Sequence, residues 1–271
     1  MTSPKICRSH GAEEPLWQAL VAAAHDGTSP PKIGRDSLMN TYLPLIVPAR
    51  RTKSLVIAQI GQSLDGRIAT ASGHSHYING KSAIVHLHRL RALVDAVVVG
   101  VGTALADDPQ LTVRRVNGPN PARVVIDPAG RLPANARCLE EGARRIVIGS
   151  AARPPRTGVE AISLPAAAGR FSPRDIIAAL ADLGLHRILI EGGGMTISQF
   201  LDAGCLDRLH VLVAPMIVGS GRIGIQLAEI ARLDEAVRPS VTVTTFDEGD
   251  VLFDCDLGRR RKCPSGDWDE G

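Results

Sequence analysis

Two glycine-rich turns carry the residues of this chain that are best suited to hold a ligand. Gly100 and Gly102 follow the apolar run 96–99, and three glycines, 192–194, follow the run 186–191. A buried strand that ends in such a turn presents unpaired backbone N–H groups and the start of a helix, which favour phosphate oxygens. Two such turns on neighbouring strands would suit a pyrophosphate, although ordinary turn chemistry would also explain the glycines.

The first of these turns is not the usual dinucleotide fingerprint. Its pattern, Gly100-x-Gly102-x-x-Leu105, lacks the third glycine, which normally permits close packing between helix and strand. A dinucleotide that binds here would therefore be held in another way.

Arginines could bind an anionic group near these turns. Arg91 is expected near the end of a helix beside the strand 95–100, and Arg114 closes the polar segment after the first turn. A guanidinium group binds phosphate through two parallel hydrogen bonds, but a salt bridge to a nearby aspartate is the alternative for both residues. Further candidates are Arg67, Arg115, Arg123 and Arg131.

Histidine pairs raise the question of a metal site. His74 and His76 fall in a polar loop, while His86 and His88 fall on different faces of a predicted helix. No third ligand stands at a suitable spacing, so we interpret all four as surface residues and expect no metal. The chain also lacks the H-x-E and P-C-x-x-C motifs of the zinc nucleoside deaminases.

The composition is that of a soluble α/β protein. Of 271 residues 44% are hydrophobic but only 3% are aromatic, so the core must be built from Val, Ile, Leu and Ala. A net charge of +3 does not indicate nucleic-acid binding, and no apolar run approaches the roughly 18 residues of a membrane span. Five scattered cysteines and the absence of a signal peptide favour a cytoplasmic protein with no nucleic-acid or membrane partner.

The pattern of elements divides the chain into three parts. Residues 1–51 form an N-terminal extension, with a helix over 13–25 and an extended segment over 42–48, which would pack on the main domain or on a second subunit. Residues 52–257 alternate strands with helices, which predicts an α/β sheet. Residues 258–271 are expected to form a flexible charged tail. The predicted strands are 55–63, 95–100, 122–127, 144–150, 186–191 and 208–219, the helices are 81–94, 174–183 and 196–202, and a hairpin covers 241–257.

The motifs SLDGRIA, ASGHSHY, GVGTALADDPQLTVR and ILIEGGGMTISQFL closely resemble the reductase domain of the bifunctional riboflavin-biosynthesis deaminase/reductase family, over about residues 54–255. The resemblance implies a dihydrofolate-reductase-like fold: a mixed, mostly parallel sheet flanked by helices and closed by a C-terminal β-hairpin. It also implies a stand-alone reductase that forms a homodimer. This enzyme would use NADPH to reduce 5-amino-6-(5-phosphoribosylamino)uracil to its ribitylamino product, by hydride transfer to C1′ of the open-chain sugar imine.

The same resemblance implies the residues of the site, although it assigns no catalytic residue. The cofactor NADPH would contact Gly61, Tyr77, Thr103, Asp107, Pro128, Gly193, Gly194, Met195, Thr196, Ile197, Ser198 and Gln199. The substrate would contact Ser75, Arg91, Leu111, Arg114 and Glu191. Arg91 and Arg114 would hold its phosphate, and Glu191 would bind the sugar or the ring.

Three positions depart from the family pattern. Gln59 stands where many members have a lysine that reaches the substrate, Tyr77 replaces a tryptophan, and Pro128 lacks a hydroxyl group. A reductase of the same fold acting on another pyrimidine, pterin or imine is therefore one alternative, and a non-catalytic nucleotide-binding protein is another. Asp65 of SLDGR could serve the sugar or the structure.

Overall fold

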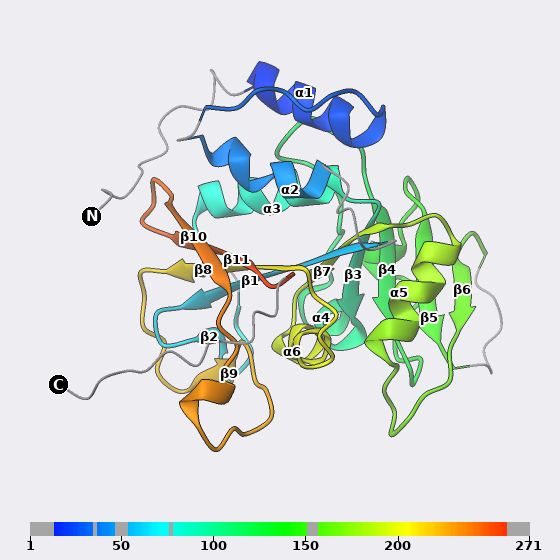
Figure 1. Cartoon of the computed structure of the whole chain (residues 1–271). Helices are drawn as coiled ribbons and strands as arrows, with labels where there is room; N and C mark the ends of the chain where they lie inside the picture. The colour runs from blue at the N-terminus through cyan, green and yellow to red at the C-terminus, as the bar shows by residue number, and fades with distance from the viewer. Residues whose placement is uncertain (1–13, 35–36, 47–53, 76–77, 151–156, 259–271) are drawn as a thin grey trace.

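The computed structural model describes residues 14–34, 37–46, 54–75, 78–150 and 157–258 (Figure 1). Tyr77, His76 and the predicted tail from residue 259 onward lie outside the described residues.

Among the described residues, nine strands form one sheet in the order β10-β11-β8-β1-β7-β3-β4-β5-β6. The strands from β8 to β6 run parallel, whereas β11 is antiparallel to β8 and pairs with β10 as a hairpin. The expected mixed, mostly parallel sheet with its closing hairpin is therefore confirmed. The strands of this sheet are β1 (Leu55–Ser63), β3 (Ala96–Gly100), β4 (Ala122–Ile126), β5 (Arg145–Gly149), β6 (Glu160–Ser163), β7 (Arg187–Glu191), β8 (Arg208–Ala214), β10 (Ser240–Thr245) and β11 (Val251–Asp256). A small second sheet pairs β2 (Arg67–Thr70) with β9 (Gly221–Ile223).

Helices cover both faces of the large sheet (Figure 1). The helices α1 (Glu14–His25), α2 (Leu43–Ile46) and α3 (Lys81–Leu93) share one hydrophobic cluster with one face, and α5 (Pro173–Asp182) and α6 (Gly194–Asp202) share a second cluster with the other. The short α4 (Val101–Asp107) follows β3 directly. Short 3-10 helices are η1 (Leu38–Thr41), η2 (Arg137–Leu139) and η3 (Leu233–Glu235). No helix in the described ranges combines the length and the apolar character that crossing a bilayer requires.

The N-terminal extension packs on the body of its own chain. Trp17 and Tyr42 are fully buried. The Trp17 indole N–H donates to the carbonyl of Asn117 at 2.7 Å, and the His25 ring lies 2.8 Å from the carbonyl of Ala92 at the end of α3. Each large apolar side chain buried in this way stabilises the fold by about 1.5–3 kcal/mol, so the extension is part of the core.

The prediction of an extended segment from Tyr42 onward is wrong. The chain forms η1 and then α2 as far as Ile46, with Pro44 at the second helical position. Proline is tolerated in the first turn of a helix because its missing N–H would have no partner there. Residues 47 and 48 of the predicted segment lie outside the described residues.

Other boundaries shift by a few residues. The strand predicted over 208–219 ends at Ala214, and the helix predicted from Thr196 starts at Gly194. The start of α3 is capped from a distance: the Asp250 carboxylate, at the β10–β11 turn, accepts the Gly80 N–H at 2.6 Å. The closing hairpin therefore holds the helix that carries Arg91.

Candidate functional site

The two glycine turns lie side by side and interlock. Strands β3 and β7 are hydrogen-bonded neighbours, so both turns leave the same edge of the sheet. The Gly193 N–H donates to the Thr103 hydroxyl at 2.8 Å, and an added Cβ at Gly192 would lie 2.7 Å from the Thr103 methyl. In return, an added Cβ at Gly100 would lie 2.6 Å from the Thr196 hydroxyl. Each turn needs glycine because the threonine of the other turn packs on it.

The starts of α4 and α6 face this shared edge. Neither helix has a side chain that caps its first turn. An added Cβ at Gly102, in the first turn of α4, would meet nothing within 4 Å, so the backbone there borders open space. At the start of α4, backbone N–H groups beside open space are suited to phosphate oxygens. At the start of α6 the Gly193 N–H already donates to Thr103, and an added Cβ at Gly194 would overlap the Gly224 carbonyl.

The predicted cofactor segment 193–199 divides into two halves. Met195 is 74% exposed and Thr196 packs on the first turn, whereas Gly194 is buried against the carbonyl of Gly224. Ile197 is fully buried, the Ser198 hydroxyl accepts the Gln226 N–H, and the Gln199 amide donates to a backbone carbonyl. The side chains of 197–199 therefore serve the protein's own packing.

Other predicted contacts surround this edge. The Ser75 hydroxyl donates to the Asp107 carboxylate at 3.0 Å. Ser75 is a predicted substrate contact and Asp107 a predicted cofactor contact, so the two predicted sets of residues meet here. At Gly61 an added Cβ would overlap the Asn79 amide, so the close approach of Asn79 requires the glycine. Pro128 follows β4 and is half-buried, and its carbonyl accepts the Ser150 hydroxyl at 2.8 Å.

A buried ion pair forms the floor of the site. The Arg91 guanidinium donates to both oxygens of the Glu191 carboxylate at 2.7 Å, and its third nitrogen donates to the Thr112 carbonyl at 3.0 Å. Both side chains are 7% exposed. Arg91 therefore forms a salt bridge, the alternative to phosphate binding, but with a glutamate instead of the expected aspartate. Each of the three guanidinium nitrogens has a protein partner.

Arg114 lies above this pair and is exposed. Its guanidinium donates to the Thr112 hydroxyl at 2.6 Å, and its backbone N–H donates to Nδ1 of buried His88 at 3.0 Å. Burial, followed by the charges of neighbouring arginines, lowers the pKa of His88 to about 3, so the ring stays a neutral acceptor. The Leu111 side chain is buried in the core, and its backbone has a positive φ of 57°, so only the backbone could contact a ligand.

The interpretation of His86 and His88 as surface residues is wrong, because both are buried. The helix α3 lies between the sheet and the N-terminal extension, so even its polar positions are covered. His74 is exposed, as expected.

Buried polar side chains continue across the sheet from Glu191. Gln59 on β1 is in register with Glu191 on one side and with His210 on the other, and His210 is in register with Asp254 on β11. His86 of α3 meets this row, with its Nε2 3.0 Å from Nδ1 of His210. Gln59 therefore lies between a carboxylate and a histidine.

Tyr42 of the extension extends this row into a chain of contacts. Its hydroxyl lies 2.8 Å from Nδ1 of His86, and Nε2 of His210 lies 3.1 Å from the Asp254 carboxylate. The tyrosine hydroxyl can donate to His86, whose other ring nitrogen can then donate to Nδ1 of His210. Burial, followed by the charges of His210 and Arg89, lowers the pKa of His86 well below its ordinary value.

Asp65 serves the structure. Its carboxylate accepts the N–H groups of Val218 and Gly219 at 3.1 and 2.7 Å and the Ser63 hydroxyl at 2.5 Å. These bonds, with that of Ser63 the strongest, lower the pKa of Asp65 to about 2. The loop after β8 is thereby fixed to the turn after β1.

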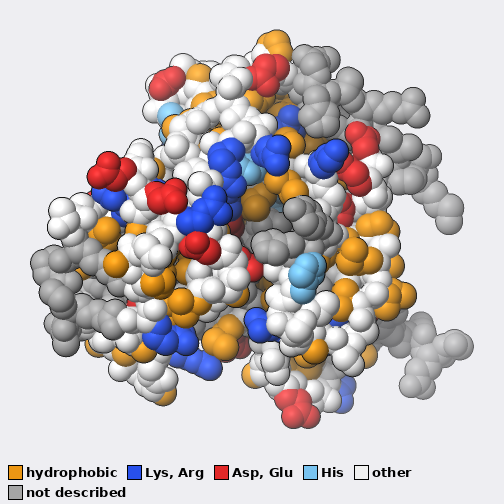
Figure 2. Space-filling model, turned by 180° about the vertical axis from the view of Figure 1, so that it is seen from behind, with side chains coloured by type: hydrophobic (Ala, Val, Ile, Leu, Met, Phe, Trp, Pro, Cys, Tyr) orange, Lys and Arg blue, Asp and Glu red, His pale blue; other side chains and the backbone are white. Residues whose placement is uncertain are grey.

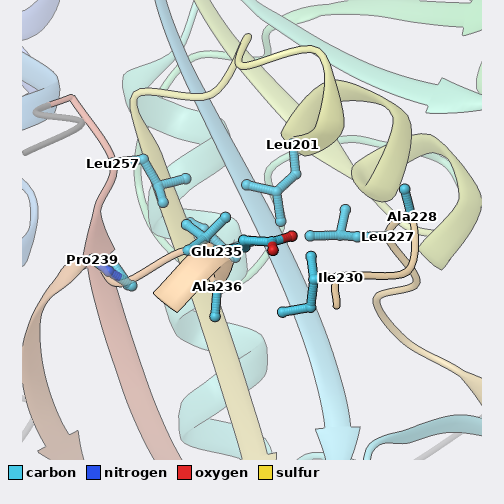
Figure 3. Close-up of a pocket in the computed structure, with 10 residues that line it drawn as sticks. Leu201, Leu227, Ala228, Ile230, Glu235, Ala236, Pro239 and Leu257 are labelled. Atoms are coloured by element: carbon cyan, nitrogen blue, oxygen red, sulfur yellow. The ribbon is translucent and has the colours of Figure 1, made fainter. Parts of the chain in front are cut away.

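A separate pocket lies away from this site (Figure 3). Apolar side chains from α6, β8 and the segment 227–239 line it, and Glu235 contributes the one carboxylate. None of the residues predicted to bind cofactor or substrate lines this pocket.

Comparison with known proteins gives the family. The model of the RibD C-terminal domain matches residues 54–246. The 2,5-diamino-6-ribosylamino-4(3H)-pyrimidinone 5′-phosphate reductase of Methanothermobacter thermautotrophicus is 38% identical over 187 residues, which cover 66% of this chain and 86% of that protein. The riboflavin biosynthesis protein RibD of Aquifex aeolicus is 37% identical over 59% of this chain but only 46% of its own length, so this chain spans about half of that relative.

Solved structures share the fold. RibD of Acinetobacter baumannii superposes with a TM-score of 0.67 at 29% identity, covering 81% of this chain and 61% of that one. The deaminase/5-amino-6-(5-phosphoribosylamino)uracil reductase of Thermotoga maritima gives a TM-score of 0.65 at 29% identity, covering 80% and 59%. The family model covers well over half of the chain, including both interlocked turns and the buried ion pair, and the chain belongs to the RibD C-terminal domain family.

Proposed function

We propose that this chain is a reductase of riboflavin biosynthesis that uses NADPH to convert a 5-amino-6-(phosphoribosylamino)pyrimidine into its ribitylamino product. The observation that carries this proposal is the pair of interlocked glycine turns at the carboxyl ends of β3 and β7, directly beside the Arg91–Glu191 pair and Arg114. The names of its relatives, which are pyrimidine reductases, support the reaction.

The first candidate substrate is 5-amino-6-(5-phosphoribosylamino)uracil, the pyrimidine for which the Thermotoga maritima reductase is named. A second candidate is the 2,5-diamino pyrimidinone, because the relative named for it is matched by this chain over most of its length. The two differ at C2 of the ring, which carries oxygen in one and an amino group in the other. A site that hydrogen-bonds one of these groups would reject the other strongly.

The residues present fit a nicotinamide dinucleotide. Gly102 borders open space, and the first turns of α4 and α6 offer N–H groups without side-chain caps. Thr103 fixes the second turn through Gly193, so the two phosphate-binding segments are held in one arrangement before binding. When bound, the reduced nicotinamide supplies the hydride.

The substrate side would be built on Glu191. Its carboxylate, oriented by two hydrogen bonds from Arg91, would accept hydrogen bonds from the sugar or the ring. Gln59, in register with Glu191, would add a neutral amide where the family resemblance implies a charged lysine. The exposed Arg114 would bind the phosphate.

The test is a turnover assay with purified protein, NADPH and each of the two pyrimidines. We expect NADPH absorbance to fall in step with formation of the ribitylamino product, and NADH to react more slowly. Binding of NADPH without turnover of either pyrimidine would favour a different pyrimidine, pterin or imine substrate. Binding without turnover of any member of a wider panel of these compounds would favour a non-catalytic nucleotide-binding protein.

We also propose that the chain forms a homodimer. Strand β8 is paired on both edges, by β1 and β11, and cannot extend a sheet across two subunits. The outer strand β10 is a better candidate, because Val241 and Val243 are 46% and 48% exposed. Light scattering in solution would measure the mass, and a monomer at micromolar concentration would contradict this proposal.

A further inference from the structure

Asn79, just before α3, places a neutral hydrogen-bond acceptor over the carboxyl-terminal half of β1. An added Cβ at Gly61 would overlap the Asn79 amide oxygen, so Oδ1 occupies the space that a side chain would take at that position. Alternate residues of a strand point to the same face of a sheet, so Gly61 and Gln59 share a face. Gln59 is in register with Glu191. The Asn79 oxygen therefore lies on the side of the sheet that carries the buried ion pair.

The closing hairpin fixes the orientation of this amide. Its nitrogen Nδ2 donates to the Asp250 carboxylate at 2.9 Å, and the same carboxylate accepts the Gly80 N–H at 2.6 Å. Asp250 is 1% exposed, so water does not replace these bonds. Because an ionised carboxylate only accepts hydrogen bonds, the NH2 group of Asn79 must face Asp250, and its oxygen must face Gly61.

The Asn79 oxygen has no partner of its own. Within the ranges that the structure describes, no N–H or O–H group donates to this oxygen, and the atom is not fully enclosed by the protein. The backbone beside it also lacks a strand neighbour on one side. β1 pairs with β8 as far as Ser63, but its pairing with β7 stops at Gln59. A donor that enters from the side of β7 and its glycine turn therefore meets an acceptor that is already in place.

This acceptor differs from the charged groups on the surface. Figure 2 shows Lys and Arg side chains gathered across the middle of the rear face, and such cations are suited to phosphate groups. An amide oxygen is suited instead to an N–H group and requires no charge on it. On the reacting ring of a nicotinamide dinucleotide, the N–H donor is the NH2 group of the carboxamide.

We propose that Asn79 is a further residue of the cofactor site, where its oxygen accepts a hydrogen bond from the carboxamide NH2 group of the nicotinamide. Asp250 is the positioning residue that holds the Asn79 amide for this contact. Binding of NADP(H) is part of the proposed function, on which this assignment rests. A carboxamide held here fixes the rotation of the nicotinamide ring beside Gln59 and Glu191, where the substrate would react.

The test compares equilibrium binding of NADP⁺ with that of its acetylpyridine analogue, in which a methyl group replaces the carboxamide NH2 group. The wild type should bind NADP⁺ about threefold to tenfold more tightly, which is the effect of one hydrogen bond between neutral groups. Asn79→Ala should bind the two dinucleotides equally. Asp250→Asn should show an intermediate ratio, because the Asn79 amide can then turn. The matched control is Asn117→Ala, which also breaks an amide–carboxylate bond, to Glu14 of α1, and should keep the wild-type ratio.

Two results would overturn the assignment of Asn79. Equal binding of both dinucleotides by the wild type would show that no acceptor meets the NH2 group, and this comparison stands even if a variant is unstable. A ratio that persists in Asn79→Ala would reflect the different electronic properties of the two rings, or another acceptor. A wild type that binds neither dinucleotide would overturn the proposed function together with this assignment, whereas equal binding would overturn the assignment alone.

Discussion

Acid should destabilise this protein through His88, and the size of the effect follows from the structure. The ring is 3% exposed and accepts the backbone N–H of Arg114, and its pKa of about 3 compares with an ordinary value of 6.5. Between these two values the unfolded chain binds a proton that the folded chain does not bind. Stability from this residue is therefore complete above about pH 6.5 and is lost as the pH falls.

The expected loss is about 2 kcal/mol between about pH 7.5 and about pH 5. At about pH 5 the unfolded histidine lies roughly 1.5 units below its pKa, and each unit corresponds to about 1.4 kcal/mol. Burial of the ring next to Arg91, Arg114 and Arg115 keeps the folded form neutral throughout this window. Ordinary carboxylates titrate at lower pH and contribute little there.

Urea unfolding of the wild type and of His88→Gln at both pH values measures this term. The glutamine amide can still accept the N–H of Arg114 but does not titrate in this range. The wild type should lose about 2 kcal/mol more than the variant on acidification. His86→Gln is a positive control, because it removes a second buried histidine whose pKa is lowered. Equal losses in wild type and His88→Gln would refute the assignment of a neutral, buried His88.

Three further substitutions test the interlocked turns, the buried pair and the extension. Gly192→Ala should lower the free energy of unfolding in urea by about 1–3 kcal/mol, because Gly192 has a φ of 93° and an added Cβ would strike a threonine methyl. The control Gly102→Ala, whose added Cβ meets nothing, should leave that free energy unchanged. Equal losses in the two variants would contradict this reasoning. Arg91→Met should lower the free energy of unfolding by about 3–5 kcal/mol, because Glu191 is left buried and unpaired. Adding Glu191→Leu should restore most of that stability in the same assay. A double variant as unstable as the single one would count against the ion pair. Tyr42→Phe should lower the free energy of unfolding by about 1–2 kcal/mol, because a buried ring nitrogen loses its donor, and an unchanged urea midpoint would show that this hydrogen bond is not formed.

The strands and turns of the site were predictable because their signals are local. The continuous apolar runs that end at Gly100 and Glu191 indicated buried strands followed by glycine turns, and both are as expected. β6 was not predicted because this strand has only four residues, which are mostly exposed and therefore show no apolar pattern. The segment 42–46 was misread because Pro44 suggests extended chain, although it is allowed in the first turn of a helix.

The partners within the site could not be predicted, because they are distant in sequence. Arg91 and Glu191 are 100 residues apart, and neither residue type reveals the other. The burial of His86 could not be predicted, because it results from the extension covering the outer side of α3, and the periodicity of one helix does not show that cover. Thr103 was expected to contact the cofactor, but its hydrogen bond to Gly193 follows only from the neighbouring positions of β3 and β7.

The position of β11 has a practical consequence for anyone who trims this chain. The family match stops at residue 246, inside the closing hairpin, yet β11 lies between β10 and β8 in the sheet. A fragment cut at the limits of the match would expose one whole edge of β8, detach β10, and lose the cap that Asp250 places on α3. It would also strip the outer cover of α3, including Trp17. The smallest piece that retains the complete core runs from α1 to β11. The region matched by the family model is therefore shorter at both ends than the part of the chain that folds as one core.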